Sequence, residues 1–184
     1  MSPDEAAVAE FLAAKGLIVN LFSKEELQSS KTPDFRVYIG ENFAFYCEVK
    51  SIRAGKTDGL KSDPIFNRLT NDIHLAAKQF HSVNPSNEVP NVLAFVNHDN
   101  LCGFLDLIAV YTGNHIAENG AASPIYRQFS EGRIKNEKST AHLVIWLDDF
   151  KPYRLLFTNT NVAFHDDLCD YIGINSVDIK IVDA

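Results

Sequence analysis

The chain has 184 residues, of which 46% are hydrophobic and 22% are charged. This length fits one domain, and the composition supplies a continuous core and excludes wholesale disorder. The formal net charge is −7 and the pI is about 5.3, which argues against a protein that coats nucleic acid through bulk positive charge.

The sequence favours an intracellular location. No stretch reaches the ~20 apolar residues needed to cross a bilayer, and the first five residues are acidic where a secretory signal would be basic. The cysteines Cys47, Cys102 and Cys169 lack paired or metal-type spacing and have apolar neighbours, so we expect buried free thiols in a reducing compartment. We therefore predict a cytoplasmic protein that does not enter a membrane.

The N-terminal segment predicts a helix followed by a strand. Ser2 is a typical helix cap, Pro3 suits the first helical position, and Glu5 completes a capping box. Apolar residues then recur at helical spacing as far as Gly16, where the helix is expected to end. Residues 17–22 read as a strand, and the polar residues 23–32 as an exposed loop.

A hairpin is predicted over residues 35–51. Alternation runs from Phe35 to Gly40, a tight turn follows at residues 40–42, and alternation resumes from Phe43 to Ser51. In the second strand one face is expected to carry Phe43, Phe45, Cys47 and Val49. The other face is expected to carry Ala44, Tyr46, Glu48 and Lys50.

The remaining elements predict an α/β protein with a mixed central sheet flanked by helices. Residues 52–62 read as a loop, and Asp63 and Pro64 cap a long helix whose buried stripe is Ile65, Leu69, Ile73, Ala76 and Phe80. A break at 84–90 precedes a buried strand at 92–96, a helix over 101–111, irregular structure over 112–139, and a strand pair at 143–147 and 154–157. With no linker in sight, we expect a single domain over 1–184, with its core in 2–96 and a C-terminal elaboration in 97–184.

Three polar residues of the hairpin are predicted to gather. Glu48 and Lys50 are two residues apart on a strand, so their side chains share a face. Asp34 enters the antiparallel neighbour where the other strand ends, which puts it beside them. Two carboxylates suit magnesium, with the Val49 carbonyl as a further ligand, and an ammonium group can stabilise developing charge.

These residues resemble a known motif. Thr32-Pro33-Asp34, followed after thirteen residues by Glu48-Val49-Lys50-Ser51, is similar to the PD-(D/E)XK motif of the restriction-endonuclease-like superfamily. The resemblance implies an α-β-β-β-α-β core with C-terminal additions, and a Mg²⁺-dependent endonuclease acting on DNA or, less often, RNA. It implies that Asp34 and Glu48 hold the metal, for which Mn²⁺ substitutes, and that Lys50 assists the attacking water.

The resemblance suggests two further site residues. Such families often add a glutamate from the first helix, which favours Glu5, although Glu5 also serves the Ser2 capping box and Glu10 is the alternative. The long helix of related nucleases contributes a Gln or Lys, which favours Gln79 with Lys78 behind it. For Gln79 and Lys78, the competing interpretation is that they lie on an ordinary exposed helix face.

Two other readings of the whole protein stay open at this point. One is a nuclease-like module that has lost catalysis and binds nucleic acid or a protein. The other is an unrelated α/β protein in which Glu-x-Lys occurs by chance. The segment from Lys50 to Phe80 contains six basic and three acidic residues, a local positive charge that suits a nucleic-acid partner. The sequence leaves open the cleavage specificity and the choice between a homodimer and a larger complex.

Overall fold

The computed structural model describes residues 1–54, 64–117, 119–125, 134, 137–148, 153–158 and 164–174. It is an α/β structure built on a mixed six-stranded sheet with strand order β1-β2-β3-β4-β7-β8. The first three strands are antiparallel neighbours, β3, β4 and β7 run parallel, and β8 returns antiparallel. The predicted fold class is therefore confirmed at the level of a mixed sheet flanked by helices.

The N-terminal half contains three helices and four strands in the part of the chain described. They are α1 (Pro3–Ala13), β1 (Ile18–Leu21), α2 (Lys24–Ser29), β2 (Phe35–Ile39), β3 (Asn42–Ile52), α3 (Pro64–Val83) and β4 (Asn91–Asn97). The later elements are α4 (Phe104–Thr112), β5 (Asn114–Ile116), β6 (Ala122–Pro124), β7 (Leu143–Asp148), β8 (Arg154–Phe157) and α5 (His165–Ile172).

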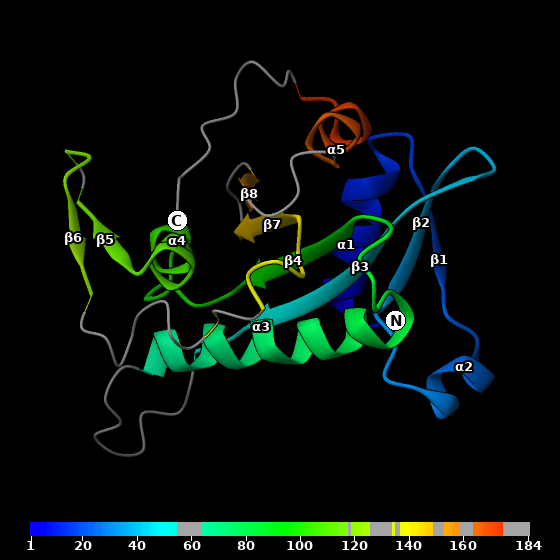
Figure 1. The fold of residues 1–184 in the computed structure, drawn as a ribbon, viewed down its shortest axis with the longest axis horizontal. Coiled ribbons are helices and arrows are strands. Elements are labelled where there is room, and N and C mark those ends of the chain that lie inside the picture. Colours follow the sequence, from blue (N-terminus) through cyan, green and yellow to red (C-terminus); the bar gives the residue numbers. More distant parts are fainter. Residues whose placement is uncertain are drawn as a thin grey trace.

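Helices cover both faces of the sheet, so the protein has two cores. On one face α1 and α5 bury residues such as Val8 and Leu168 against the sheet. On the other face α3 and α4 bury residues such as Phe80 and Leu107. Figure 1 shows α3 crossing the sheet in front, with α1 on the opposite side. β4 lies between the two layers, and all seven of its residues are buried.

The predicted start of α1 is confirmed, whereas the prediction of a loop over residues 23–32 is wrong. The Ser2 hydroxyl accepts the Glu5 N–H and the Glu5 carboxylate accepts the Ser2 N–H, which completes the predicted capping box. Residues Lys24–Ser29 form α2, which begins with a second capping box between Ser23 and Glu26. The same physical signal starts both helices.

A β-bulge corrects the predicted faces of β3. Val37 pairs with Phe45 and Tyr38 pairs with Phe43, so Ala44 is an extra residue on β3. A bulge places two successive side chains on one side of the strand, and Ala44 is buried in the same core as Phe45. Phe43 instead contacts the rings of Tyr38 and Tyr46 on the face that carries Glu48. The bulge therefore makes two predictions wrong: Phe43 does not share a face with Phe45, and Ala44 does not share one with Glu48.

The later elements follow the prediction with one addition. The helix stripe, the buried strand β4 and the late pair β7–β8 are present. Within the segment expected to be irregular, β5 and β6 form a small two-stranded ribbon beyond α4 (Figure 1). Asp63 and most of the 52–62 loop lie outside the described residues. In the ranges described, no helix combines the length and apolarity needed to span a bilayer, and all three cysteines are buried and free.

Candidate functional site

Asp34 and Glu48 are linked by two hydrogen bonds between β3 and the residue that precedes β2. Asp34 immediately precedes β2, and its Oδ2 accepts the Val49 N–H at 2.7 Å. Reciprocally, the Asp34 N–H donates to Glu48 Oε2 at 3.1 Å. The two carboxyl groups therefore lie close together, at the point where the start of β2 runs beside β3.

Lys50 and Gln79 complete this cluster. The Lys50 ammonium donates to Glu48 Oε1 at 2.6 Å and to Gln79 Oε1 at 2.9 Å. The Gln79 amide in turn donates to the Thr32 carbonyl at 3.1 Å. Gln79 thus ties α3 both to β3 and to the segment that delivers Asp34. We call the four residues Asp34, Glu48, Lys50 and Gln79 the hairpin site.

Both carboxyl groups of the hairpin site resist ionisation. Burial raises the pKa of Glu48 to about 8, and the Asp34 charge adds to the rise although Lys50 opposes it. Burial likewise raises the pKa of Asp34, with the Val49 N–H opposing the rise and the Glu5 charge adding to it. Two acids with raised pKa beside one ammonium group are typical of a site that takes a cation.

The donor set fits magnesium. Mg²⁺ prefers oxygen ligands and is usually held by one or two carboxylates, with waters completing its shell. In the described ranges no group of three or more His, Cys, Asp or Glu side chains is arranged to hold a metal. The hairpin site offers two carboxylates, those of Asp34 and Glu48. The N–H and C=O of one strand residue point to the same side, which directs the Val49 carbonyl toward Asp34. The paired ladder with β2 ends at Phe35 and Cys47, before it reaches Val49.

The site residues suggested on the two helices lie at different distances from the hairpin site. Glu5 is held by its capping box, and its charge reaches Asp34 strongly enough to raise the pKa of that carboxyl. Glu10 is exposed on the same helix. Lys78 is also exposed, next to the partly buried Gln79 that contacts Lys50. Of the residues suggested on α3, Gln79 is therefore the one that reaches the hairpin site.

Sequence reasoning missed a second polar cluster at the end of β3. Asp4 is only 4% exposed. Its carboxylate accepts from the Ser51 hydroxyl, pairs with Arg53 at 2.9 Å and meets His98 Nε2 at 2.9 Å. These hydrogen bonds lower the pKa of Asp4 although burial, the largest single influence, opposes them. In the sequence Asp4 looks like an ordinary acid of a helix's first turn, so no signal singled it out.

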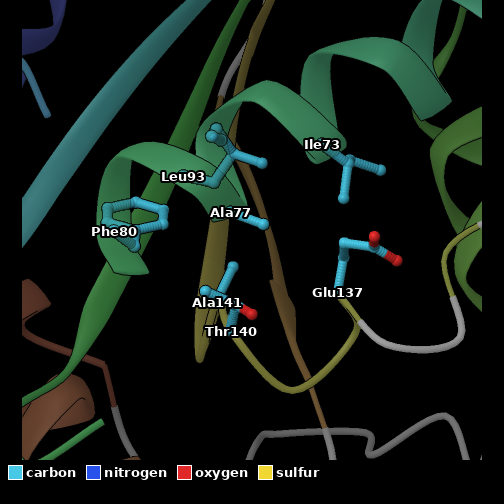
Figure 2. Close-up of a pocket in the computed structure, with 8 residues that line it drawn as sticks. Ile73, Ala77, Phe80, Leu93, Glu137, Thr140 and Ala141 are labelled. Carbon is cyan, nitrogen blue, oxygen red and sulfur yellow. The ribbon is translucent and has the colours of Figure 1, made fainter. Parts of the chain in front are cut away.

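Two hollows elsewhere provide no comparable chemistry. The one drawn in Figure 2, between α3 and residues 137–141, is lined mainly by apolar side chains such as Ile73 and Phe80 and is too narrow for a water molecule. A cavity of about 150 Å³ lies at the ends of β4 and β7. Two of its polar side chains bond each other, Asn97 donating to Asp148 at 2.9 Å.

Comparisons of the chain with protein-family models, with curated proteins and with solved structures found no match.

Proposed function

We propose that this protein is a metal-dependent endonuclease of the PD-(D/E)XK type that hydrolyses phosphodiester bonds of DNA. The observation that carries the proposal is the hairpin site. The buried Glu48 carboxyl and the partly buried Asp34 carboxyl both have a raised pKa. Lys50 donates to Glu48, and the Val49 N–H donates to Asp34. Burying ionisable groups costs free energy, and a bound cation would offset that cost.

The order of the elements gives further support. Helix α1, strands β1, β2 and β3, helix α3 and strand β4 follow one another as the resemblance implies, with α2 inserted between β1 and β2. Asp34 immediately precedes β2, and Glu48 and Lys50 lie on β3. The buried free cysteines suit a reducing compartment, and we place the activity in the cytoplasm.

The residues of the hairpin site have separate roles in this proposal. Asp34, Glu48 and the Val49 carbonyl would hold Mg²⁺, which neutralises phosphate charge and acidifies a bound water. Lys50, held between Glu48 and Gln79, supplies a fixed positive charge that stabilises the charge developing on the phosphate. Gln79 restricts where the Lys50 ammonium can go, which reduces the reorganisation needed during reaction.

The test is nicking of supercoiled plasmid with Mg²⁺ or Mn²⁺. The wild type should convert the plasmid, whereas Asp34→Asn and Lys50→Ala should lower the rate by about 10²-fold or more, as losses of charge-stabilising groups do. Calorimetric titration should show Mn²⁺ binding to the wild type and much weaker binding to Asp34→Asn. Circular dichroism of each variant verifies that it remains folded.

Two exposed residues provide matched controls. Glu41→Gln removes a carboxylate in the hairpin turn, and Lys24→Ala removes an ammonium group on α2; both side chains are exposed. Both variants should nick at the wild-type rate. A folded wild type that binds DNA but never cuts it would instead make the protein a catalytically inactive module. A wild type that neither binds Mn²⁺ nor contacts DNA would remove the proposal altogether.

A further inference from the structure

One buried hydroxyl beside the hairpin site lacks a partner. Thr32 is 6% exposed, and its Oγ1 has no hydrogen-bond partner among the residues that the structure describes. Its backbone groups are satisfied, because the N–H donates to the Ser30 carbonyl and the carbonyl accepts from Gln79. The missing bond is therefore confined to the side chain.

The position of Thr32 connects this hydroxyl to the hairpin site. Thr32 precedes Pro33, and a residue before proline adopts an extended backbone. Thr32 also lies two residues before Asp34 in the chain. From the helix side, Gln79 donates to the Thr32 carbonyl and accepts from Lys50. Thr32 is thus held at the hairpin site by Gln79, two residues before Asp34 in the chain.

An unpartnered buried hydroxyl normally indicates a missing water or ion. Burying a hydroxyl without a hydrogen bond is unfavourable, and valine has the same shape without that penalty. Native proteins satisfy nearly all buried polar atoms, with ordered water where no protein group reaches. A threonine here thus lowers stability unless its hydroxyl binds something.

We propose that the Thr32 hydroxyl binds a water molecule of the hairpin site and acts as a positioning residue for hydrolysis. This inference rests on the proposed nuclease function. A threonine hydroxyl both donates and accepts, so it can orient a water whose other bonds go to the hairpin site. It does not itself touch the phosphate.

The test separates stability from rate. In Thr32→Val the metal-free melting temperature should fall less than in Thr112→Val, because no hydrogen bond within the described part of the protein is lost. The kcat for cleavage of a defined DNA oligonucleotide with Mn²⁺ should fall about 10–100-fold with KM unchanged, since misplacing a reacting group costs up to about 10²-fold. Thr32→Ser keeps the hydroxyl and should restore most of kcat.

Thr112→Val is the matched control. Thr112 is 7% exposed, but its hydroxyl donates to the Ile108 carbonyl at 2.9 Å, so this variant should melt at a lower temperature while cleaving at the wild-type rate. The inference is overturned if Thr32→Val cleaves as fast as the wild type, or if its melting temperature falls as far as that of Thr112→Val. If the wild type cleaves DNA and Asp34→Asn does not, either of these results overturns the role of Thr32 and leaves the proposed nuclease function intact. A wild type inactive with Mn²⁺ overturns both proposals.

Discussion

Burial makes Glu48 the residue on which the chemistry of the hairpin site depends. Glu48 is 2% exposed, and Lys50 at 2.6 Å does not offset the combined effect of burial and Asp34 on its pKa. A cation would supply the positive charge that Lys50 alone does not. Metal binding would therefore favour the ionised form of Glu48.

The metal-free protein should lose stability as pH rises from about 6.5 to about 8. Glu48 keeps its proton up to about pH 8 when folded and releases it near 4.5 when unfolded, so it lowers stability as pH rises through that range. Buried His142 has its pKa lowered to about 4 from 6.5, and it lowers stability as pH falls through that range. The two effects oppose each other below about 6.5, and only that of Glu48 remains above it.

Urea denaturation at a series of pH values measures this slope. Glu48→Gln should flatten the decline above pH 6.5 by removing the Glu48 titration, and saturating Mg²⁺ should flatten it in the wild type by favouring the ionised carboxylates. Glu41→Gln, in the exposed turn, should retain the decline. An unchanged slope in Glu48→Gln would show that Glu48 ionises normally in the folded protein.

At the scale of elements, the two capping boxes support helices of different importance. Helix α1 buries Val8 and Leu12 in the core that it shares with α5. In α2, by contrast, the apolar side chain Leu27 is 56% exposed. Ser2→Ala should lower the free energy of unfolding by about 0.5–2 kcal/mol, the usual effect of losing a cap. Ser23→Ala should mainly increase amide exchange within α2, with little global change, because α2 can open locally. Equal losses of unfolding free energy would contradict this difference.

The bulge in β3 makes a specific deletion tolerable. Phe43 faces Tyr46, whereas Ala44 and Phe45 both face the opposite core. Removing Ala44 therefore leaves strict alternation with every other side chain on its present face. The Ala44 deletion should remain folded and active in the nicking assay, since Glu48 and Lys50 keep their relation to Asp34.

Inserting an alanine between Tyr46 and Cys47 is the matched control for this deletion. It reverses the faces of one part of β3 relative to the other, and it should abolish folding or activity. If the deletion is as damaging as the insertion, the bulge has a role beyond setting the register.

How much the sequence could predict depended on how local each signal was. Alternation in two strands was enough to place Asp34 beside Glu48. The bulge was hidden because Phe43 and Ala44 are both apolar and fit either face. Helix α2 was missed because it has a capping box but no apolar stripe. The unpartnered Thr32 hydroxyl depends on three-dimensional packing, which no local pattern reports.

At the scale of the molecule, the C-terminal segment completes the sheet on which the hairpin site stands. The sequence suggested a core in residues 2–96 with a later elaboration. In the structure β4 pairs with β3 on one side and with β7 on the other. Phe95 packs against Trp146 with ring centroids 5.7 Å apart, and the Asn91 N–H donates to His142 Nδ1 at 2.9 Å.

A fragment of residues 1–97 should therefore fail to fold alone. Without β7, strand β4 becomes a sheet edge that exposes Val92, Phe95 and its unpaired backbone groups, which favours aggregation. The fragment also loses α4 and α5, so part of each core faces water, and the apolar burial that offsets chain entropy is lost. Circular dichroism and light scattering of the fragment should show a poorly structured, associating chain, and co-expression with residues 98–184 should restore the soluble fold and Mn²⁺ binding. A fragment that melts cooperatively as a monomer would show that α1 to β4 form an independent unit and that the later strands are an addition to it.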